Sequence, residues 1–245
     1  GEIMGNHVTL YEGPNVEGKD IVVLACMGSD NVKTSNVVTL NVLSQEMTPS
    51  DAVKAGLDSV ICGNCSKRPK HYQARYQMQL AKLRSLGMTK AKANRKVRDE
   101  GLAGTPCYVT KIHGPRAAYK EWQDGNAPAI QPAEFIAEMR FRGLTEFRNA
   151  GYGDSAMVPK QALLPFLSAV RAVGYANIGY TEQWFAKRAQ WLRSFCMASV
   201  DNEKQRDMAQ AMGWLTFRAI QPGEAIADNE AHCGASAEMG HAMTC

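Results

Sequence analysis

The second half of the chain alternates strand-like and helix-like segments, and this alternation constrains the fold more than any other feature of the sequence. Short apolar segments predict strands at Glu146–Ala150, Asn177–Tyr180, Cys196–Val200 and Leu215–Ile220. Amphipathic segments between them predict helices at Pro159–Val173, Phe185–Arg193 and Glu203–Met212. A strand and helix that recur about every 22 residues predict parallel strands joined by helical crossovers. We therefore expect an α/β fold with a parallel sheet.

The rest of the chain predicts further elements of this fold. Strands are expected at Asp20–Met27, Asn36–Leu43 and Asp58–Ile61, with a last strand at Ala231–Cys233. Helices are expected from the cap at Thr48–Asp51 to about Gly56, and at Pro115–Trp122 and Pro132–Phe141. A chain of 245 residues with 45% hydrophobic residues can bury one large core. We expect a single domain over residues 1–245.

The sequence carries no sign of a membrane span or of secretion. It lacks an apolar run of about 18 residues and a signal-peptide pattern. Its seven cysteines are an odd number, which favours reduced thiols and a cytoplasmic protein. Gly1 in place of a methionine indicates a trimmed or tag-derived start, and Cys245 at the last position leads us to expect that the natural chain continues.

Five of the cysteines lie at the ends of predicted elements, where thiolates bind metals more readily than they pack a core. Cys62 and Cys65 form a C-x2-C pair, and Gly63 between them permits a tight turn. A redox pair or a chance spacing is the alternative for this motif alone. The expected metal ligands are Cys62, Cys65, Cys107, Cys233 and Cys245. Cys26 and Cys196 fall in apolar segments and are expected to be buried thiols.

Polar residues follow each predicted strand of the second half. They are Tyr152, Asp154 and Ser155, then Thr181, Gln183 and Trp184, then Ser199, Asp201 and Asn202, and finally Arg218, His232 and Cys233. Ligands of parallel α/β folds bind at the carboxyl ends of strands, so this recurrence predicts a polar pocket there. The sequence has no Walker motif, no G-x-G-x-x-G and no G-x-S-x-G to identify a known catalytic loop.

The segment from Lys67 to Arg98 contains many Lys and Arg residues and no acidic residue. Its pattern predicts two basic helices separated by a turn at Leu86–Thr89, within an inserted hairpin over residues 67–103. One interpretation is a solvated hairpin that decorates the domain. The other is a contact with DNA or RNA phosphates through Lys82, Arg84, Lys90, Lys92, Arg95, Lys96 and Arg98.

Several segments resemble an uncharacterised phage family, the mycobacteriophage gene-product-eighty-eight type. They are Lys33-Thr34, Gly56-Leu57-Asp58-Ser59-Val60, the C-x2-C pair, Cys107-Tyr108-Val109, Gly151-Tyr152-Gly153-Asp154, Gly179-Tyr180-Thr181, Met197-Ala198-Ser199-Val200-Asp201, Gly213-Trp214-Leu215-Thr216-Phe217-Arg218 and the stretch from Cys233 to Cys245. Relatives of this type have a shorter link before Cys107, which marks the basic hairpin as an insertion, and they continue into a cysteine-rich tail. The resemblance spans nearly the whole chain, implies a location in the host cytoplasm, and brings no established activity.

The chain also distantly resembles radical-SAM enzymes, which implies a partial, TIM-like β/α barrel with an iron–sulfur cluster and S-adenosylmethionine. Cys62, Cys65 and Cys107-Tyr108 look like a stretched version of that family's cysteine trio. Gly151 to Ser155 is similar in position to the Gly-Gly-Glu-Pro segment that contacts the cofactor, and Cys233 and Cys245 look like an auxiliary-cluster region. The compact C-x3-C-x2-C motif of the family is absent.

These observations support three hypotheses. The first is a radical-SAM-like iron–sulfur enzyme acting on a nucleotide or peptide, with Asp154 and Asp201 as catalytic residues and a pocket lined by Tyr152, Gly153, Asp154, Ser155, Ser199, Asp201 and Arg218. The second is a zinc-stabilised nucleic-acid-binding protein without catalytic activity. The third is a globular α/β protein whose cysteines are simply reduced thiols.

Overall fold

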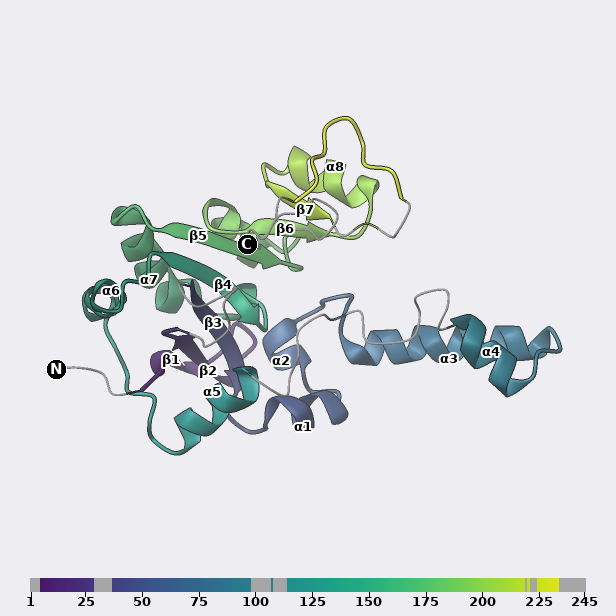
Figure 1. Cartoon of the computed structure of the whole chain (residues 1–245), viewed down its shortest axis with the longest axis horizontal. Helices are drawn as coiled ribbons and strands as arrows, with labels where there is room; N and C mark the ends of the chain where they lie inside the picture. The colour runs from purple at the N-terminus through teal and green to yellow at the C-terminus, as the bar shows by residue number, and fades with distance from the viewer. Residues whose placement is uncertain are drawn as a thin grey trace.

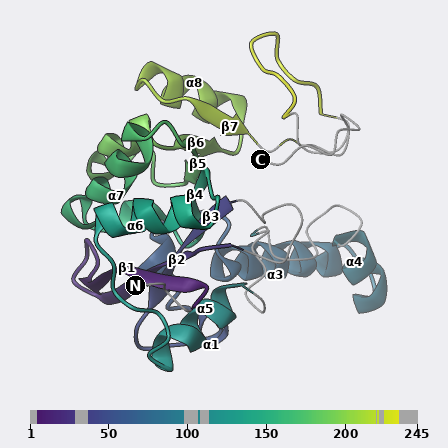
Figure 2. The same ribbon diagram turned by 60° about the vertical axis from the view of Figure 1, so that its left-hand side comes forward.

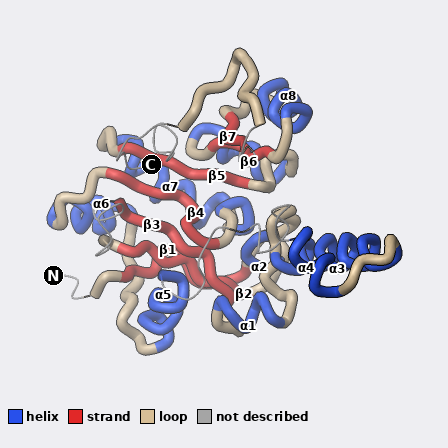
Figure 3. The backbone as a smooth tube through the Cα atoms, turned by 45° about the vertical axis from the view of Figure 1, so that its right-hand side comes forward, coloured by secondary structure: helices blue, strands red, loops and turns tan. Residues whose placement is uncertain are grey.

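The computed structural model describes residues 5–28, 37–97, 107, 114–218, 220 and 224–233. Within these residues, seven strands form one mixed sheet in which spatial order follows chain order (Figure 1). The strands are β1 His7–Pro14, β2 Asp20–Cys26, β3 Val37–Ser44, β4 Glu146–Tyr152, β5 Ala176–Thr181, β6 Met197–Val200 and β7 Thr216–Arg218. Figure 3 shows these strands side by side across the molecule.

The sheet is antiparallel at its first edge and parallel over the rest. β1 pairs with β2 and β2 with β3 in antiparallel register, whereas β3, β4, β5, β6 and β7 are successive parallel neighbours. Each parallel pair is separated in sequence by a crossover long enough to return the chain to the same end of the sheet. The expected α/β architecture is confirmed. The sheet is mostly rather than wholly parallel, and β1 was not among the predicted strands.

Helices and turns of helix fill the connections. They are α1 Pro49–Lys54, α2 Ser59–Cys62, α3 Pro69–Ser85, α4 Lys90–Val97, α5 Gly114–Gln123, α6 Pro132–Phe141, α7 Lys160–Ala172 and α8 Glu203–Ala211, with 3₁₀ turns η2 Ser155–Met157 and η3 Lys187–Ser194. Among the described residues, none of these helices has the length and apolar character needed to cross a bilayer.

The core lies between the sheet and the helices that cover it (Figure 2). Residues Ile21–Ala25 of β2 are fully buried, as expected for a strand covered on both faces. Phe135 of α6 contacts Phe147 of β4 edge-on with ring centroids 6.0 Å apart, and it contacts Phe166 of α7 at 5.7 Å. These aromatic contacts fix α6 and α7 against the strand whose end carries Tyr152 and Asp154.

Three of the predicted elements differ from the observed ones. Asp58–Ile61, predicted as a strand, belongs to the turn and helix α2, in which the Cys62 amide donates to the Asp58 carbonyl at 2.9 Å. Four residues, of which only Val60 and Ile61 are apolar, are too few for periodicity to separate a helix from a strand. The segment predicted as the helix Phe185–Arg193 forms the 3₁₀ turn η3, and Ala231–Cys233 is not a strand.

The basic segment forms the predicted helical hairpin, which we call the arm, residues 69–97. Gly87 ends α3 with a φ of 83°, a conformation that glycine adopts without strain, and the Thr89 hydroxyl accepts from the Lys92 amide at 3.4 Å. Figure 1 shows the arm extending away from the sheet. The remainder of the predicted insertion, 98–103, and Arg98 with it, lies outside the described residues.

Residues 224–233, which we call the C-terminal strap, are held to the end of the sheet by ion pairs. Arg218 of β7 contacts Glu230 through two bonds of 2.7 and 2.6 Å and also pairs with Glu224. Arg206 of α8 reaches the same Glu230 at 3.2 Å. The guanidinium of Arg218, followed by the Ala227 amide, lowers the pKa of Glu230 to about 2.

We expect acid to release the C-terminal strap. Since the folded pKa of Glu230 is depressed from 4.5 to about 2, its stabilising contribution is complete above about pH 4.5 and is lost as the pH falls toward 2. Hydrogen-exchange protection of the amides in residues 224–233 should therefore fall between pH 5 and pH 2. Glu230→Gln should lower the protection at neutral pH, and Glu203→Gln, at an exposed glutamate of α8, should not. Equal protection in both variants would contradict this account.

Candidate functional site

The carboxyl ends of the parallel strands bring together residues that are far apart in sequence. β4 ends at Tyr152, β5 at Thr181 and β6 at Val200. Helix α2 lies against this end of the sheet, beside β3 in Figure 1, and the Asp154 amide donates to the Ile61 carbonyl at 2.7 Å. The loop Cys62–Arg68, which we call the cysteine loop, therefore crosses the strand ends as the general rule for ligand sites in parallel sheets expects.

Two glycines allow this close approach. Gly63 has a φ of 54°, and a Cβ there would lie 2.9 Å from the side chains of Gln183 and Met157. Gly153 has a φ of 77°, and a Cβ there would lie 2.8 Å from Cβ of Val42. Only glycine fits either position without displacing its neighbours. The cysteine loop therefore packs closely against the ends of β3, β4 and β5.

A buried ion pair holds the base of the cysteine loop. Arg68 donates to both carboxylate oxygens of Asp58, at 3.1 and 2.9 Å, and each side chain is less than a tenth exposed. The same guanidinium donates to the carbonyls of Gly63 at 3.3 Å and Gly56 at 3.1 Å. The bidentate geometry and the additional carbonyl acceptors offset the free-energy cost of removing this ion pair from water. Arg68 therefore determines where Cys62 and Cys65 lie.

A half-buried cluster of charges joins the cysteine loop to β5 and β6. Nζ of Lys67 lies 2.5 Å from Oε1 of Glu182, 3.3 Å from Oδ1 of Asp201 and 3.2 Å from the Ser199 hydroxyl. Ser199 donates to Glu182 at 2.7 Å, and Ser66 donates to Asp201 at 3.0 Å. Burial opposes the charge on Lys67, but the two carboxylates outweigh it and raise its pKa. We call these five residues the Lys67 cluster.

Asp154 lies beneath this surface rather than on it. Its carboxylate accepts from the Thr181 hydroxyl at 2.9 Å, the Ala156 amide at 2.9 Å and the Glu182 amide at 3.0 Å. Burial raises the pKa of Asp154 to about 6, although these donors favour the ionised form. The geometry makes Asp154 a positioning residue that joins the ends of β4 and β5, and its predicted catalytic role remains a prediction.

Cys62, Cys65 and Cys107 share one neighbourhood. Burial raises the pKa of Cys62 well above its usual value, and the nearby groups Cys65, Asp58, Cys107 and Asp154 raise it further. Burial and then Glu182 raise the pKa of Cys65 to about 12, although its sulfur accepts from the Lys67 amide. Within the described residues, no three His, Cys, Asp or Glu side chains adopt a metal-binding arrangement.

Tyr152 presents an unusual donor to this neighbourhood. Its side chain is 4% exposed, and its hydroxyl has no hydrogen-bond partner among the described residues. Burial, followed by Cys62, Asp58 and Cys107, raises the pKa of Tyr152. An unpaired buried donor costs about 1–3 kcal/mol, so such a group marks a place where a ligand atom would find a partner.

The other predicted site residues lie in several separate places. Ser199 and Asp201 lie in the Lys67 cluster and face the cysteine loop. The Ser155 hydroxyl is buried and donates to Asn149, which in turn donates to the buried Cys196 sulfur at 2.9 Å. Arg218 is occupied by the C-terminal strap, which also carries the exposed Cys233. Gly153 allows the close backbone approach described above. Cys245 lies outside the described residues.

Lys67, Ser66 and Glu182 were not predicted as site residues. Glu182 follows β5 directly, so the strand-end rule that selected its neighbours Thr181 and Gln183 could have found it. Lys67 was placed with the basic segment, and only the tertiary structure shows that its side chain turns toward the sheet.

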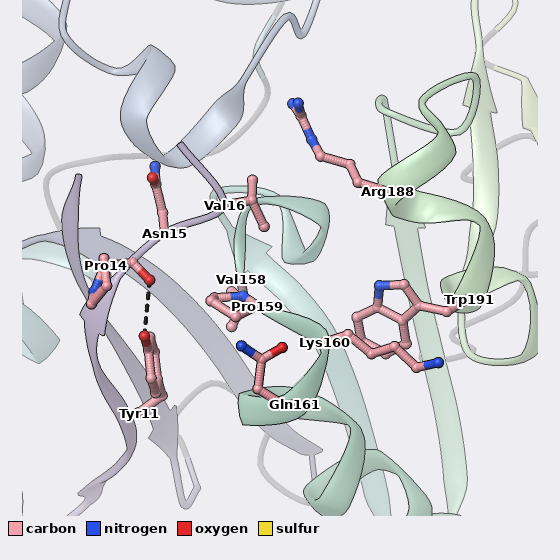
Figure 4. A pocket seen from close by; sticks show the side chains of 10 residues that line it. All are labelled: Tyr11, Pro14, Asn15, Val16, Val158, Pro159, Lys160, Gln161, Arg188 and Trp191. Carbon is pink, nitrogen blue, oxygen red and sulfur yellow. Dashed lines mark hydrogen bonds between the residues drawn. The ribbon is translucent and has the colours of Figure 1, made fainter. Parts of the chain in front are cut away.

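A separate pocket of about 400 Å³ lies between the end of β1, the start of α7 and η3 (Figure 4). Tyr11, Lys160, Arg188 and Trp191 are among its lining residues, and Arg188 also pairs with Glu17 at 3.3 Å. None of the predicted ligands or catalytic residues lines this pocket. The candidate site is therefore the surface formed by the cysteine loop and the Lys67 cluster.

Comparisons of the chain with protein-family models, with curated proteins and with solved structures found no match.

We expect Arg68→Met to destabilise the fold by about 3–5 kcal/mol, because it leaves the Asp58 carboxylate buried without its partner. The measurement is the free energy of unfolding in urea. Lys54→Met is the control, because it breaks the exposed Lys54–Asp51 pair and should change stability little. Arg68→Met combined with Asp58→Leu should recover much of the loss. Equal stabilities of Arg68→Met and Lys54→Met would contradict the role given to this pair.

Proposed function

We propose that the chain is a phage-type iron–sulfur protein and a radical-SAM-like enzyme, in which Cys62, Cys65 and Cys107 hold the cluster. The observation that carries the proposal is that Cys65 and Cys107 both lie near enough to Cys62 to raise its pKa, at the end of β4 where the Asp154 amide donates to the Ile61 carbonyl. Cys65 and Cys107 come from segments more than 40 residues apart in sequence. Cysteine thiolates are the usual ligands of iron–sulfur clusters.

The proposed barrel is consistent with the order of the parallel strands. β3, β4, β5, β6 and β7 are neighbours in chain order, which is the order of strands in a β/α barrel. In such a barrel the site lies at the carboxyl ends of the strands, where the cysteine loop and Ser199 and Asp201 are found. The arrangement supports a partial barrel and a site at its mouth.

One side chain beside these thiols has the chemistry that a cluster would use, although the described thiols are not drawn together as ligands. The orphaned hydroxyl of Tyr152 supplies a hydrogen-bond donor next to Cys62 and Cys107, and donors of this kind tune iron–sulfur centres. When bound, a cluster with three cysteine ligands leaves one iron open to S-adenosylmethionine or substrate and supplies an electron for radical chemistry.

The remaining roles fall to residues of the chain itself. Arg68 and Gly63 position the cysteine loop, and Asp154 positions the ends of β4 and β5. Glu182, Ser199 and Asp201 present oxygen atoms at the edge of the cysteine loop, where they would bind the amino or hydroxyl groups of a cofactor or of a nucleotide or peptide substrate. Lys67 holds these oxygens together. In this proposal the enzyme acts in the cytoplasm of the host cell.

Zinc is the second candidate for the same thiols. A partly buried C-x2-C pair with a third cysteine is also a ligand set for structural zinc, which would cross-link the cysteine loop to Cys107 or Cys233. The chain would then be a zinc-stabilised nucleic-acid-binding protein without catalytic activity.

Anaerobic purification should give a brown protein that contains iron and acid-labile sulfide and absorbs in the visible range. Cys62→Ser, Cys65→Ser and Cys107→Ser should each lose most of the iron, whereas Cys26→Ser, at the end of β2, should retain it. The measurements are iron and sulfide analysis and the absorbance spectrum. A colourless protein with about one zinc per chain would favour zinc instead, and a metal-free protein would contradict both assignments.

Tyr152→Phe should keep the iron content of the wild type but lower the reduction potential of the cluster. The reason is that the variant lacks a donor that stabilises the reduced, more negative form. Tyr11→Phe is the control, because the Tyr11 hydroxyl donates to the Pro14 carbonyl at 2.8 Å and should leave the potential unchanged. A redox titration followed by visible absorbance gives the midpoint. Identical midpoints in the two variants would refute this role of Tyr152.

A further inference from the structure

The charge of the chain is divided between the arm and the rest of the molecule. The chain contains 28 Lys and Arg and 24 Asp and Glu, a formal net charge of +4. The arm, residues 69–97, holds eight of the basic residues and no acidic residue. The remaining residues hold 20 basic and all 24 acidic residues, so their formal net charge is −4. The positive net charge of the chain is thus a property of the arm alone.

The arm packs mainly on itself. Leu83 of α3 and Ala93 of α4 are buried against Tyr76, Leu80 and Met88 in a small core separate from the main one. The Tyr76 hydroxyl donates to Asn94 at 3.1 Å and joins the two helices. Figures 1 and 2, which are turned by 60° from each other, both show the arm projecting from the body. This arrangement presents the arm to a partner larger than a small molecule.

Six cations of the arm whose side chains are described face solvent. Lys82, Arg84, Lys90, Lys92, Arg95 and Lys96 are all exposed. Lys82, Arg84, Lys90, Lys92 and Arg95 form no ion pair with any acidic residue in the described part of the chain. By contrast, Arg142 and Arg218 of the body are paired with carboxylates. Cations that face solvent without internal partners are available to an external polyanion.

We propose that the arm binds the phosphate backbone of double-stranded nucleic acid. Clustered Lys and Arg on one projecting element form the electrostatic footprint of phosphate binding, and the acidic remainder of the chain confines that binding to the arm. α3 has 17 residues and is about 26 Å long, which is comparable to the rise of seven or eight base pairs. Of the tyrosines in the arm, the one whose side chain is described, Tyr76, packs in the arm core rather than facing outward. The contacts that the exposed cations offer are to phosphates, which are closely spaced along a duplex.

The arm also connects directly to the candidate site. Lys67 and Arg68 at the end of the cysteine loop immediately precede α3, and both are fixed by carboxylates of the body. A duplex on the arm is thus held close to the cysteine loop. The proposal goes beyond the iron–sulfur assignment, because phosphate binding requires no metal. Only a reaction on the bound nucleic acid would rest on that assignment.

The test is a fluorescence anisotropy titration with a labelled DNA duplex of about 25 base pairs, at salt concentrations from about 50 to about 200 mM. The arm variant replaces Lys82, Arg84, Lys90, Lys92, Arg95 and Lys96 with Gln. The matched control replaces six exposed cations of the body with Gln, namely Lys19, Lys54, Arg116, Arg140, Arg171 and Lys204. Both variants change the net charge by the same amount. A third variant exchanges Lys for Arg and Arg for Lys at the six arm positions.

The wild type, the control and the exchanged variant should bind the duplex and lose about 10³-fold in affinity across that salt range, because about six phosphate contacts release counterions. The arm variant should bind at least about 100-fold more weakly at the lowest salt and lose most of the salt dependence. Circular dichroism should show the same helix content for all four proteins. An RNA duplex of the same sequence distinguishes RNA from DNA as the source of the phosphates.

Several results would overturn the proposal. They are an absence of duplex binding by the wild type, equal losses in the arm and control variants, and tighter binding of a single strand than of the duplex. Self-association that the arm variant abolishes, without duplex binding, would assign the arm to a second copy of the chain instead. Two measurements separate the nucleic-acid assignment of the arm from the iron–sulfur assignment of the cysteine loop. If the arm and the cysteine site act independently, the arm variant should contain as much iron as the wild type, and Cys62→Ser should bind the duplex as tightly as the wild type.

Discussion

The buried ion pair between Arg68 and Asp58 is the contact on which the candidate site depends. It fixes the end of the cysteine loop from inside, while Lys67, the preceding residue, fixes it from the side of β5 and β6. Neighbouring cations thus bind carboxylates of different elements, so that the end of the cysteine loop is tied both to the start of α2 and to the ends of β5 and β6. A loop held in this way can present its thiols in one arrangement without relying on a ligand to order it.

The sequence predicted the parts of the fold that depend on local pattern. The crossovers after β4 and β6 and the two helices of the arm appear where the alternation of apolar and polar residues placed them. β1 escaped prediction because its identity as a strand comes from pairing with β2, and its sequence ends in Glu12, Gly13 and Pro14, which are uncommon in strands. α2 was predicted wrongly because its conformation depends on the Arg68 contact with Asp58 and on packing against β3.

In the candidate site, too, local pattern predicted some features, whereas others depend on tertiary contacts. The strand-end rule selected Ser199 and Asp201 because topology alone places those residues at one edge of the sheet. It could not distinguish them from Asp154, which follows β4 in the same way but turns inward to bind Thr181 and the Glu182 amide. Whether a strand-end carboxylate faces solvent or the interior depends on neighbours that are far away in sequence, and this information appears only in the folded chain.

Lys67 and Arg68 lie where the basic arm joins the acidic remainder of the chain. These two cations continue the basic segment of the arm in sequence, yet their partners are carboxylates of the body. Among the described side chains, the boundary between internally paired and solvent-facing cations therefore lies between Arg68 and Lys82. A polyanion bound along the arm would meet Glu182 and Asp201 at this boundary, and their repulsion would keep phosphates off the cysteine loop unless Lys67 turned toward them.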